Sequence, residues 1–265
     1  MNCSHRKPDL HEGDSQCRIG QPMFRRLWQL FQMWSRANKL GFPLRRTKGW
    51  HPPERILLNG KWVPIACPQD SGCVNAFRDI FLHDCYGLET VRHPVNTVLD
   101  IGANAGFFSL STRNVFPRAT IHAYEPNARL LETLIFNSTS GNFSFFREGV
   151  GLSEGRAFLD QDQTSTVFAQ THIAPDGDVP IVSFSKCLER LGGTVDFLKC
   201  ACEGVEWQLF QDSSSWKHVK FVGMEYHCVN GHTGDECRSI LANLGFHLLV
   251  PTLHGTQYQL IWAYR

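Results

Sequence analysis

The sequence predicts an α/β protein built on a doubly wound, mostly parallel sheet, and two observations support this fold class. Apolar, β-branched runs of strand length alternate with segments of helical period along most of the chain. The clearest stretch is a strand at 97–101, a glycine-containing turn, a helix at 107–115 and a strand at 120–124 that delivers Glu125. This succession is typical of a βαβ unit that binds a nucleoside at the carboxyl ends of its strands.

The turn after the first strand has a composition suited to close contact with a ligand. Gly102 and Gly106 bracket Asn104; glycine lets backbone approach a ligand, and asparagine tolerates left-handed geometry. Asp100 ends the strand, where a carboxylate suits a cationic ligand better than a pyrophosphate. Glu125 can accept hydrogen bonds from both hydroxyls of a ribose. Together these residues favour S-adenosylmethionine, which carries a sulfonium, an ammonium and a ribose.

Three ordered motifs resemble the FkbM family of S-adenosylmethionine-dependent methyltransferases. The first motif has two parts: residues 100–110 read Asp-Ile-Gly-Ala-Asn-Ala-Gly-Phe-Phe-Ser-Leu, and residues 124–127 read Tyr-Glu-Pro-Asn. Residues 198–206, Leu-Lys-Cys-Ala-Cys-Glu-Gly-Val-Glu, are similar to that family's Leu-Lys-Ile-Asp-Val-Glu-Gly-x-Glu. Residues 225–227, Glu-Tyr-His, resemble its Glu-x-His at a later strand end.

The resemblance covers roughly residue 59 to the C-terminus. It implies a Rossmann-like doubly wound sheet of the class I methyltransferase type, closed by an antiparallel hairpin. It also implies a set of cofactor-binding residues in the first motif: Asp100, Gly102, Asn104, Gly106, Phe107, Glu125, Pro126 and Asn127.

The length of 265 residues is consistent with one methyltransferase domain, expected at 55–265, and an N-terminal extension at 1–54. Residues 1–21 are polar, and we expect them to be disordered. Residues 23–39 form an amphipathic helical pattern with arginines and glutamines opposite an aromatic stripe. This helix either packs on the domain or rests on a membrane surface or a protein partner.

The remaining elements follow from local pattern. Asn59-Gly60 predicts a hairpin between strands at 56–58 and 62–65, and a helix is expected at 75–86. Beyond Glu125 the pattern predicts helices at 130–136, 205–210 and 237–244, and strands at 143–146, 157–159, 195–200, 221–226, 246–250 and 257–264.

The composition limits which binding partners and which cellular compartment we expect for this protein. The formal net charge of +1 provides no overall field for binding nucleic acid. The ten cysteines follow neither a zinc-ligand spacing nor a compact disulfide framework, so we expect reduced thiols and a cytoplasmic protein. No apolar run is long enough for a transmembrane helix, and the N-terminus does not read as a signal peptide.

Methyl transfer to a hydroxyl requires removal of its proton, so the carboxyl ends of the later strands should supply a base. The candidates are His227, Glu203 and Glu225, with Glu206 nearby; we expect His227 to be the base, followed by Glu203. Lys199 falls inside a predicted strand and needs a carboxylate partner, for which Glu225 is the candidate. We expect no metal, because the histidines and cysteines at 227–237 match no ligand spacing.

One departure from the family pattern leaves two functions open. Ala201 stands where relatives have aspartate at the edge of the site. The first function is O-methylation of a hydroxyl on a sugar, glycan or secondary metabolite. The alternative is a cofactor-binding relative without catalysis that acts as an interaction or regulatory protein. A third possibility, an NAD-dependent oxidoreductase, is disfavoured because such enzymes usually carry a second catalytic domain.

Overall fold

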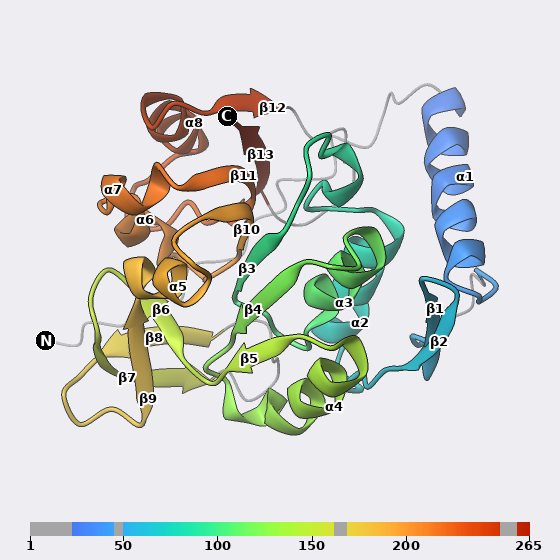
Figure 1. Cartoon of the computed structure of the whole chain (residues 1–265), viewed down its shortest axis with the longest axis horizontal. Coiled ribbons are helices and arrows are strands. Elements are labelled where there is room, and N and C mark those ends of the chain that lie inside the picture. Colours follow the sequence, from blue (N-terminus) through green and yellow to red (C-terminus); the bar gives the residue numbers. More distant parts are fainter. Residues whose placement is uncertain (1–22, 45–49, 162–168, 250–258) are drawn as a thin grey trace, which may run out of the picture.

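The computed structural model describes residues 23–44, 50–161, 169–249 and 259–265 (Figure 1). The segment expected to be disordered, 1–21, lies outside the described residues. Within these ranges, no helix combines the length and the apolar character needed to cross a bilayer.

A seven-stranded mixed sheet forms the centre of the molecule, in the order β12-β13-β11-β10-β3-β4-β5. The strands β5, β4, β3, β10 and β11 are parallel, whereas β13 runs antiparallel to both β11 and β12. The Rossmann-like doubly wound sheet and its closing antiparallel pair are therefore confirmed. The bounds are β3 Thr97–Ile101, β4 Thr120–Tyr124, β5 Ser144–Phe146, β10 Val195–Cys200, β11 Val219–Tyr226, β12 His247–Leu249 and β13 Gln259–Tyr264.

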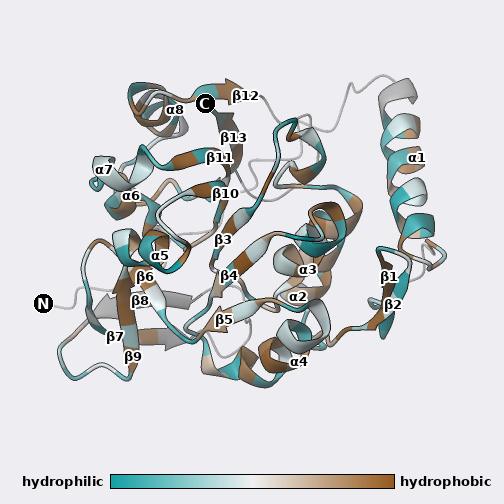
Figure 2. Ribbon diagram, in the orientation of Figure 1, coloured by the Kyte–Doolittle hydropathy of each residue, from teal (hydrophilic) through white to brown (hydrophobic). Residues whose placement is uncertain are grey.

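Both faces of this sheet are covered, which explains why its strands read as continuous apolar runs. Successive side chains point to opposite faces. Val98 and Phe197 join a core that includes α3 (Phe107–Val115) and α4 (Leu131–Gly141). Leu99 and Leu198 join a second core. That core includes the helices α5 (Phe184–Arg190), α6 (Glu206–Leu209), α7 (Ser213–Trp216) and α8 (Gly234–Asn243). Figure 2 shows the hydrophobic residues gathered in these strands.

The N-terminal part packs on the first of these cores. Helix α1 (Met23–Lys39) contributes Met33 and Ala37 to it, together with α2 (Ser71–Phe77) and the π-helical turn η2 (Arg78–Leu82). The expected boundary at residue 54 thus separates segments that share one core. The predicted hairpin is confirmed as β1 (Arg55–Leu58) and β2 (Lys61–Pro64). Its turn residues Asn59 and Gly60 both have positive φ, at 49° and 77°.

Two parts of the fold differ from the sequence prediction. The helix expected at 75–86 begins earlier, because the Asp70 carboxylate caps α2 by accepting a hydrogen bond from the Cys73 amide at 3.0 Å. A second sheet, in the order β6-β9-β7-β8, is also present, whereas the sequence pattern predicts only its strand at 157–159. Glycine, proline and polar residues interrupt these strands, so they lack the continuous apolar runs of the central sheet: β6 Gly149–Gly151, β7 Gly155–Gln161, β8 Ala169–Ile173 and β9 Val179–Ser183.

Candidate active site

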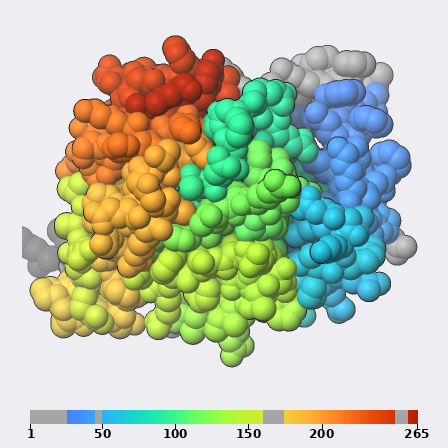
Figure 3. All heavy atoms as spheres, in the orientation of Figure 1, coloured from blue at the N-terminus to red at the C-terminus, as the bar shows by residue number. Residues whose placement is uncertain are grey.

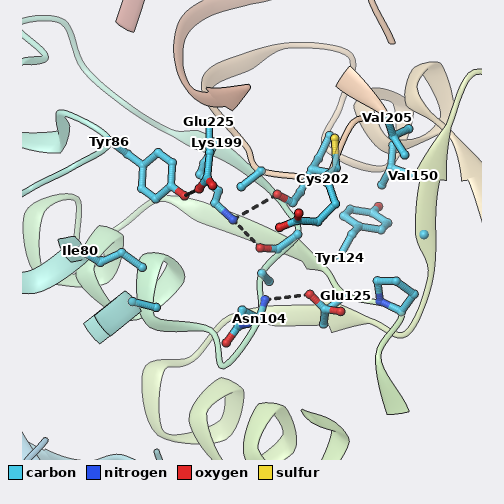
Figure 4. A pocket seen from close by; sticks show the side chains of 18 of the residues that line it. Ile80, Tyr86, Asn104, Tyr124, Glu125, Val150, Lys199, Cys202, Val205 and Glu225 are labelled. Atoms are coloured by element: carbon cyan, nitrogen blue, oxygen red, sulfur yellow. Dashed lines mark hydrogen bonds between the residues drawn. The ribbon is translucent and has the colours of Figure 1, made fainter. Parts of the chain in front are cut away.

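A cavity lies at the carboxyl ends of the central strands, where a doubly wound sheet binds its ligands (Figure 4). The turn after β3 and the end of β4 supply one side of it. The ends of β10 and β11 supply another, and the α2–η2 segment lies against both. The lining residues used below are Asp79, Ile80, Tyr86, Gly102, Asn104, Glu125, Pro126, Glu148, Gly149, Val150, Lys199, Ala201, Cys202, Glu203, Glu225 and Leu260.

The turn after β3 is shaped by close contact with β10. Gly102 has φ +72°, and a Cβ there would lie 1.8 Å from the Ala201 carbonyl oxygen, so only glycine fits. Asn104 also adopts left-handed geometry, with φ 49°. Its side-chain oxygen accepts a hydrogen bond from the Ala105 amide at 2.7 Å, which stabilises that conformation. The turn thereby places the backbone of 102–104 along the cavity.

Glu125 is fixed by two backbone donors. Its carboxylate accepts from the Asn104 amide and from the Asn127 amide, each at 2.9 Å. Burial raises the pKa of Glu125, although these two hydrogen bonds act in the opposite direction. Each oxygen keeps a further lone pair, so the carboxylate can still accept from a ligand hydroxyl.

The structure places four of the predicted cofactor residues outside the cavity lining. Gly106 faces the core, since a Cβ there would lie 2.9 Å from the Phe143 ring. Phe107 is buried among aromatic side chains, with its ring centroid 5.4 Å from that of Phe77. The Asn127 side chain accepts from the Arg129 amide at the start of the next helical turn. Together with Asp100, these residues support the turn, whereas Gly102, Asn104, Glu125 and Pro126 line the cavity.

Asp100 has a different role from the one expected. Its fully buried carboxylate lies 3.3 Å from the Lys199 ammonium and accepts a hydrogen bond from the Ser109 hydroxyl at 2.7 Å. Lys199 also donates to the carbonyls of Ile101 and Gly102 (Figure 4). The predicted pairing of Lys199 with Glu225 is corrected, because Lys199 lies directly opposite Asp100 in the β10–β3 register, whereas Gly223 lies opposite it on β11.

The three candidate catalytic residues converge around His227. The imidazole Nε2 lies 3.3 Å from Glu203 and 3.6 Å from Glu225. Its Nδ1 lies 3.1 Å from the buried carboxylate of Glu206, which also accepts from the His227 amide at 2.7 Å. Glu225 in turn accepts a hydrogen bond from the Tyr86 hydroxyl at 3.4 Å. Glu203 and Glu225 line the cavity, whereas His227 lies behind them.

The electrostatics of this cluster separate the roles of its members. Burial opposes a charge on His227, but the Glu206 hydrogen bond and the neighbouring carboxylates raise its pKa to about 9. Burial raises the pKa of Glu203 to about 7, against the lowering effect of His227. His227 is therefore protonated at neutral pH and cannot accept a proton. These pKa values favour Glu203 over His227 as the base, whereas the order expected from the sequence, His227 before Glu203, stays a prediction.

The backbone at Glu203 is strained in a way that directs its carboxylate. Glu203 has φ 53° and Gly204 has φ 100°, so two successive residues are left-handed. A glutamate rarely adopts this geometry, and such outliers occur preferentially at functional sites. The Gly204 amide donates to Glu206 at 2.9 Å, which holds the turn in place.

A metal at this cluster is compatible with the donor atoms. Ligand atoms of Glu203, Glu225 and His227 all lie within 4.8 Å of one another. The neighbouring carboxylates favour a protonated His227, which has no lone pair to bind a metal. The expected absence of a metal stays a prediction. The other histidine considered from the sequence, His232, stacks on Trp207 with ring centroids 4.1 Å apart and takes no part in the site.

Several lining residues were missed by the sequence reasoning. Glu148, Gly149 and Val150 follow β5, and the rule that ligands bind at strand carboxyl ends could have pointed to them. Ile80, Tyr86 and Leu260 come from segments distant in sequence from the βαβ unit, and only the tertiary packing brings them to the cavity.

The chain is similar to several known methyltransferases. A curated relative of Streptomyces tacrolimicus, 31-O-demethyl-FK506 methyltransferase FkbM, is 23% identical over 233 residues, which cover 71% of this chain and 88% of the relative. Precorrin-6y C5,15-methyltransferase of Geobacter metallireducens is 13% identical with a TM-score of 0.43, covering 69% of this chain and 86% of its own. Magnesium protoporphyrin IX methyltransferase of Synechocystis is 12% identical with a TM-score of 0.42, covering 71% and 82%. The Methyltransferase FkbM domain matches residues 100–248, more than half of the sequence. The chain therefore belongs to the FkbM family of methyltransferases.

Proposed function

We propose that this protein is an S-adenosylmethionine-dependent O-methyltransferase whose acceptor is an uncharged hydroxyl of a sugar, glycan or secondary metabolite. One observation carries the proposal. The same cavity is lined by the turn and strand end that carry Gly102 and Glu125 and by the carboxylates of Glu203 and Glu225. A cofactor and an acceptor can therefore meet beside a group able to take a proton.

The lining residues fit this cofactor by charge and by donor chemistry. Five acidic residues, of which Glu148 is paired with Arg190, line the cavity, against one basic residue, Lys199, among the described lining residues. Lys199 is already paired with Asp100 at 3.3 Å. An acidic lining attracts a sulfonium and repels a pyrophosphate, which disfavours NAD. Glu125, held by two backbone amides, would accept hydrogen bonds from the ribose hydroxyls.

Glu203 is the group we assign as general base. When bound, S-adenosylmethionine supplies an electrophilic methyl group. Glu203 accepts the proton of the acceptor hydroxyl, which makes that oxygen a stronger nucleophile. Its pKa of about 7 suits the task near neutral pH. His227 is a positioning residue: its charge holds Glu203 and Glu225 in place at 3.3 and 3.6 Å.

The same charges limit the acceptor. Two carboxylates on the acceptor side disfavour phosphate-bearing substrates, including nucleic acid, and favour a neutral hydroxyl. Tyr86, Ile80 and Leu260 add nonpolar surface on which a sugar ring or a hydrophobic metabolite can rest.

The proposed cytoplasmic location depends on the cysteine pattern alone.

Calorimetry and a methyl-transfer panel test the proposal. S-adenosylhomocysteine should bind the folded full-length protein, and NAD should not. Labelled methyl should then transfer to at least one member of a panel of hydroxyl acceptors. Binding of NAD without binding of S-adenosylhomocysteine would remove the basis of the proposal.

Ala201 supports a second candidate function, a cofactor-binding protein without turnover. It lines the cavity at the position where the family pattern that residues 198–206 resemble has aspartate. Ala201→Asp distinguishes the two candidates. If it raises cofactor affinity or creates turnover where the wild type has none, the silent alternative is supported. If the wild type already methylates an acceptor, Ala201 is a tolerated variation.

A further inference from the structure

Helix α1 is attached firmly to the domain along one side. Met33 and Ala37 are buried in the core, and Leu40 follows them just beyond the helix. The Arg36 guanidinium donates to the Leu82 carbonyl at 2.9 Å and pairs with Glu89 at 2.7 Å. The helix is therefore held in a fixed orientation, and its other side is presented at the edge of the molecule (Figure 3, blue).

That other side carries four large apolar residues, which we call the aromatic ridge: Leu27, Trp28, Phe31 and Trp34. Their side chains are between 53% and 57% exposed. The spacing of three and four residues places them in one row along the helix. The rings of Trp28 and Phe31 lie 5.8 Å apart and those of Phe31 and Trp34 lie 6.2 Å apart, so they form a continuous surface. A row of this kind is rare on a surface that contacts only water.

The helix also carries an excess of basic residues, of which Arg36 is the one already paired with Glu89. Its seventeen residues include four basic side chains, Arg25, Arg26, Arg36 and Lys39, and no acidic one. The first 50 residues of the sequence hold ten lysines or arginines and three acidic residues. The chain as a whole is nearly neutral at +1, so this end is distinctly positive.

We propose that the aromatic ridge of α1 binds the surface of an anionic lipid bilayer, with the helix lying parallel to the membrane plane. Tryptophan and phenylalanine favour the boundary between headgroups and acyl chains, and basic residues are attracted to anionic headgroups. The ridge is a row of half-exposed side chains along one helix, an arrangement that suits shallow insertion into lipid. Each contact is modest, so the attachment is peripheral and reversible.

Point substitutions test this proposal better than truncation, because deleting residues 1–40 would also remove Met33, Ala37 and Leu40 from the core. The test variant is Trp28→Ser/Phe31→Ser/Trp34→Ser in the full-length protein. The matched control is Phe158→Ser, since Phe158 is 45% exposed on β7, at the other end of the molecule (Figure 1). Thermal unfolding should be nearly unchanged in both, because all four side chains are exposed in the folded protein.

Co-sedimentation is measured with vesicles of phosphatidylcholine alone and with vesicles containing about one-third phosphatidylserine. The wild type and Phe158→Ser should bind the anionic vesicles, less strongly at high salt. The ridge variant should lose at least about tenfold in partitioning. Tryptophan emission should shift to the blue on vesicle addition in the wild type, and less in the ridge variant.

Three outcomes would overturn the proposal. The first is no pelleting of the wild type with anionic vesicles. The second is equal pelleting of the wild type and the ridge variant. The third is a wild-type dimer in light scattering that the ridge variant converts to a monomer without any vesicle binding, which would assign the ridge to a second copy of the chain.

Discussion

Replacing Glu203 by glutamine removes the proposed base while keeping the size of the side chain and its position near His227. The pKa of about 7 means that about half of the Glu203 carboxyls are ionised at pH 7 in the wild type. A general base contributes ~10²–10⁴ in rate, or about 3–5 kcal/mol of transition-state stabilisation. We therefore expect Glu203→Gln to lower kcat by at least about a hundredfold.

The assay is transfer of labelled methyl from S-adenosylmethionine to an active hydroxyl acceptor across pH 5.5 to 9. In the wild type, kcat should rise with pH and level off above the Glu203 pKa of about 7. In Glu203→Gln this rise of kcat with pH, the limb of the pH profile assigned to Glu203, should disappear. The matched control is Glu148→Gln, which neutralises another cavity carboxylate, one paired with Arg190 and outside the cluster. It should keep the limb and affect mainly cofactor affinity.

The same substitution has a consequence for stability that does not depend on activity. The folded-state pKa of Glu203 is raised from 4.5 to about 7, so the folded protein holds this proton more tightly than the unfolded chain. The resulting stability is present below about pH 4.5 and is lost as the pH rises through about 7. Glutamine does not titrate. Glu203→Gln should therefore be more stable than the wild type at pH 8, by on the order of 2–3 kcal/mol, and equally stable at pH 4.

Two results would refute this reasoning. A variant that keeps more than about a tenth of wild-type turnover, with the pH limb intact, would exclude Glu203 as the base. A stability difference that is the same at pH 4 and pH 8 would show that Glu203 has an ordinary pKa. The second result can be obtained by denaturant unfolding before any acceptor is known.

Four further predictions concern the rest of the site. Glu125→Ala should weaken S-adenosylhomocysteine binding in calorimetry by about 1.5–3 kcal/mol, the value of a hydrogen bond to a charged group; unchanged affinity would contradict the ribose contact. Gly102→Ala should unfold at much lower denaturant, because its Cβ would lie 1.8 Å from the Ala201 oxygen. Lys199→Met leaves the buried Asp100 carboxylate without its cationic partner, so the free energy of unfolding should fall by about 3–5 kcal/mol. Adding Asp100→Asn to that variant should restore part of this stability. Treatment with a chelator should leave turnover unchanged, because protonated His227 occupies the position between Glu203 and Glu225.

The sequence alone determined the fold class and half of the cavity. Buried parallel strands must be apolar on both faces, and this pattern is visible without any structure. The glycine turn and Glu125 are adjacent in the βαβ unit, so their meeting depends only on local chain geometry. This is why the strands at 97–101 and 120–124 and the helix at 107–115 have the predicted bounds.

Tertiary structure decided what each side chain does. Lys199 pairs with Asp100 rather than Glu225 because Asp100 lies directly opposite it on β3, whereas Gly223 lies opposite it on β11; no local pattern encodes this register. Proton affinity is likewise a sum over neighbours: three carboxylates raise the pKa of His227, and burial raises that of Glu203. The apolar stripe in the sequence of residues 23–39 predicts an amphipathic helix. Only packing showed that Met33 and Ala37 are buried while Trp28, Phe31 and Trp34 remain exposed, because burial depends on which surface the helix meets.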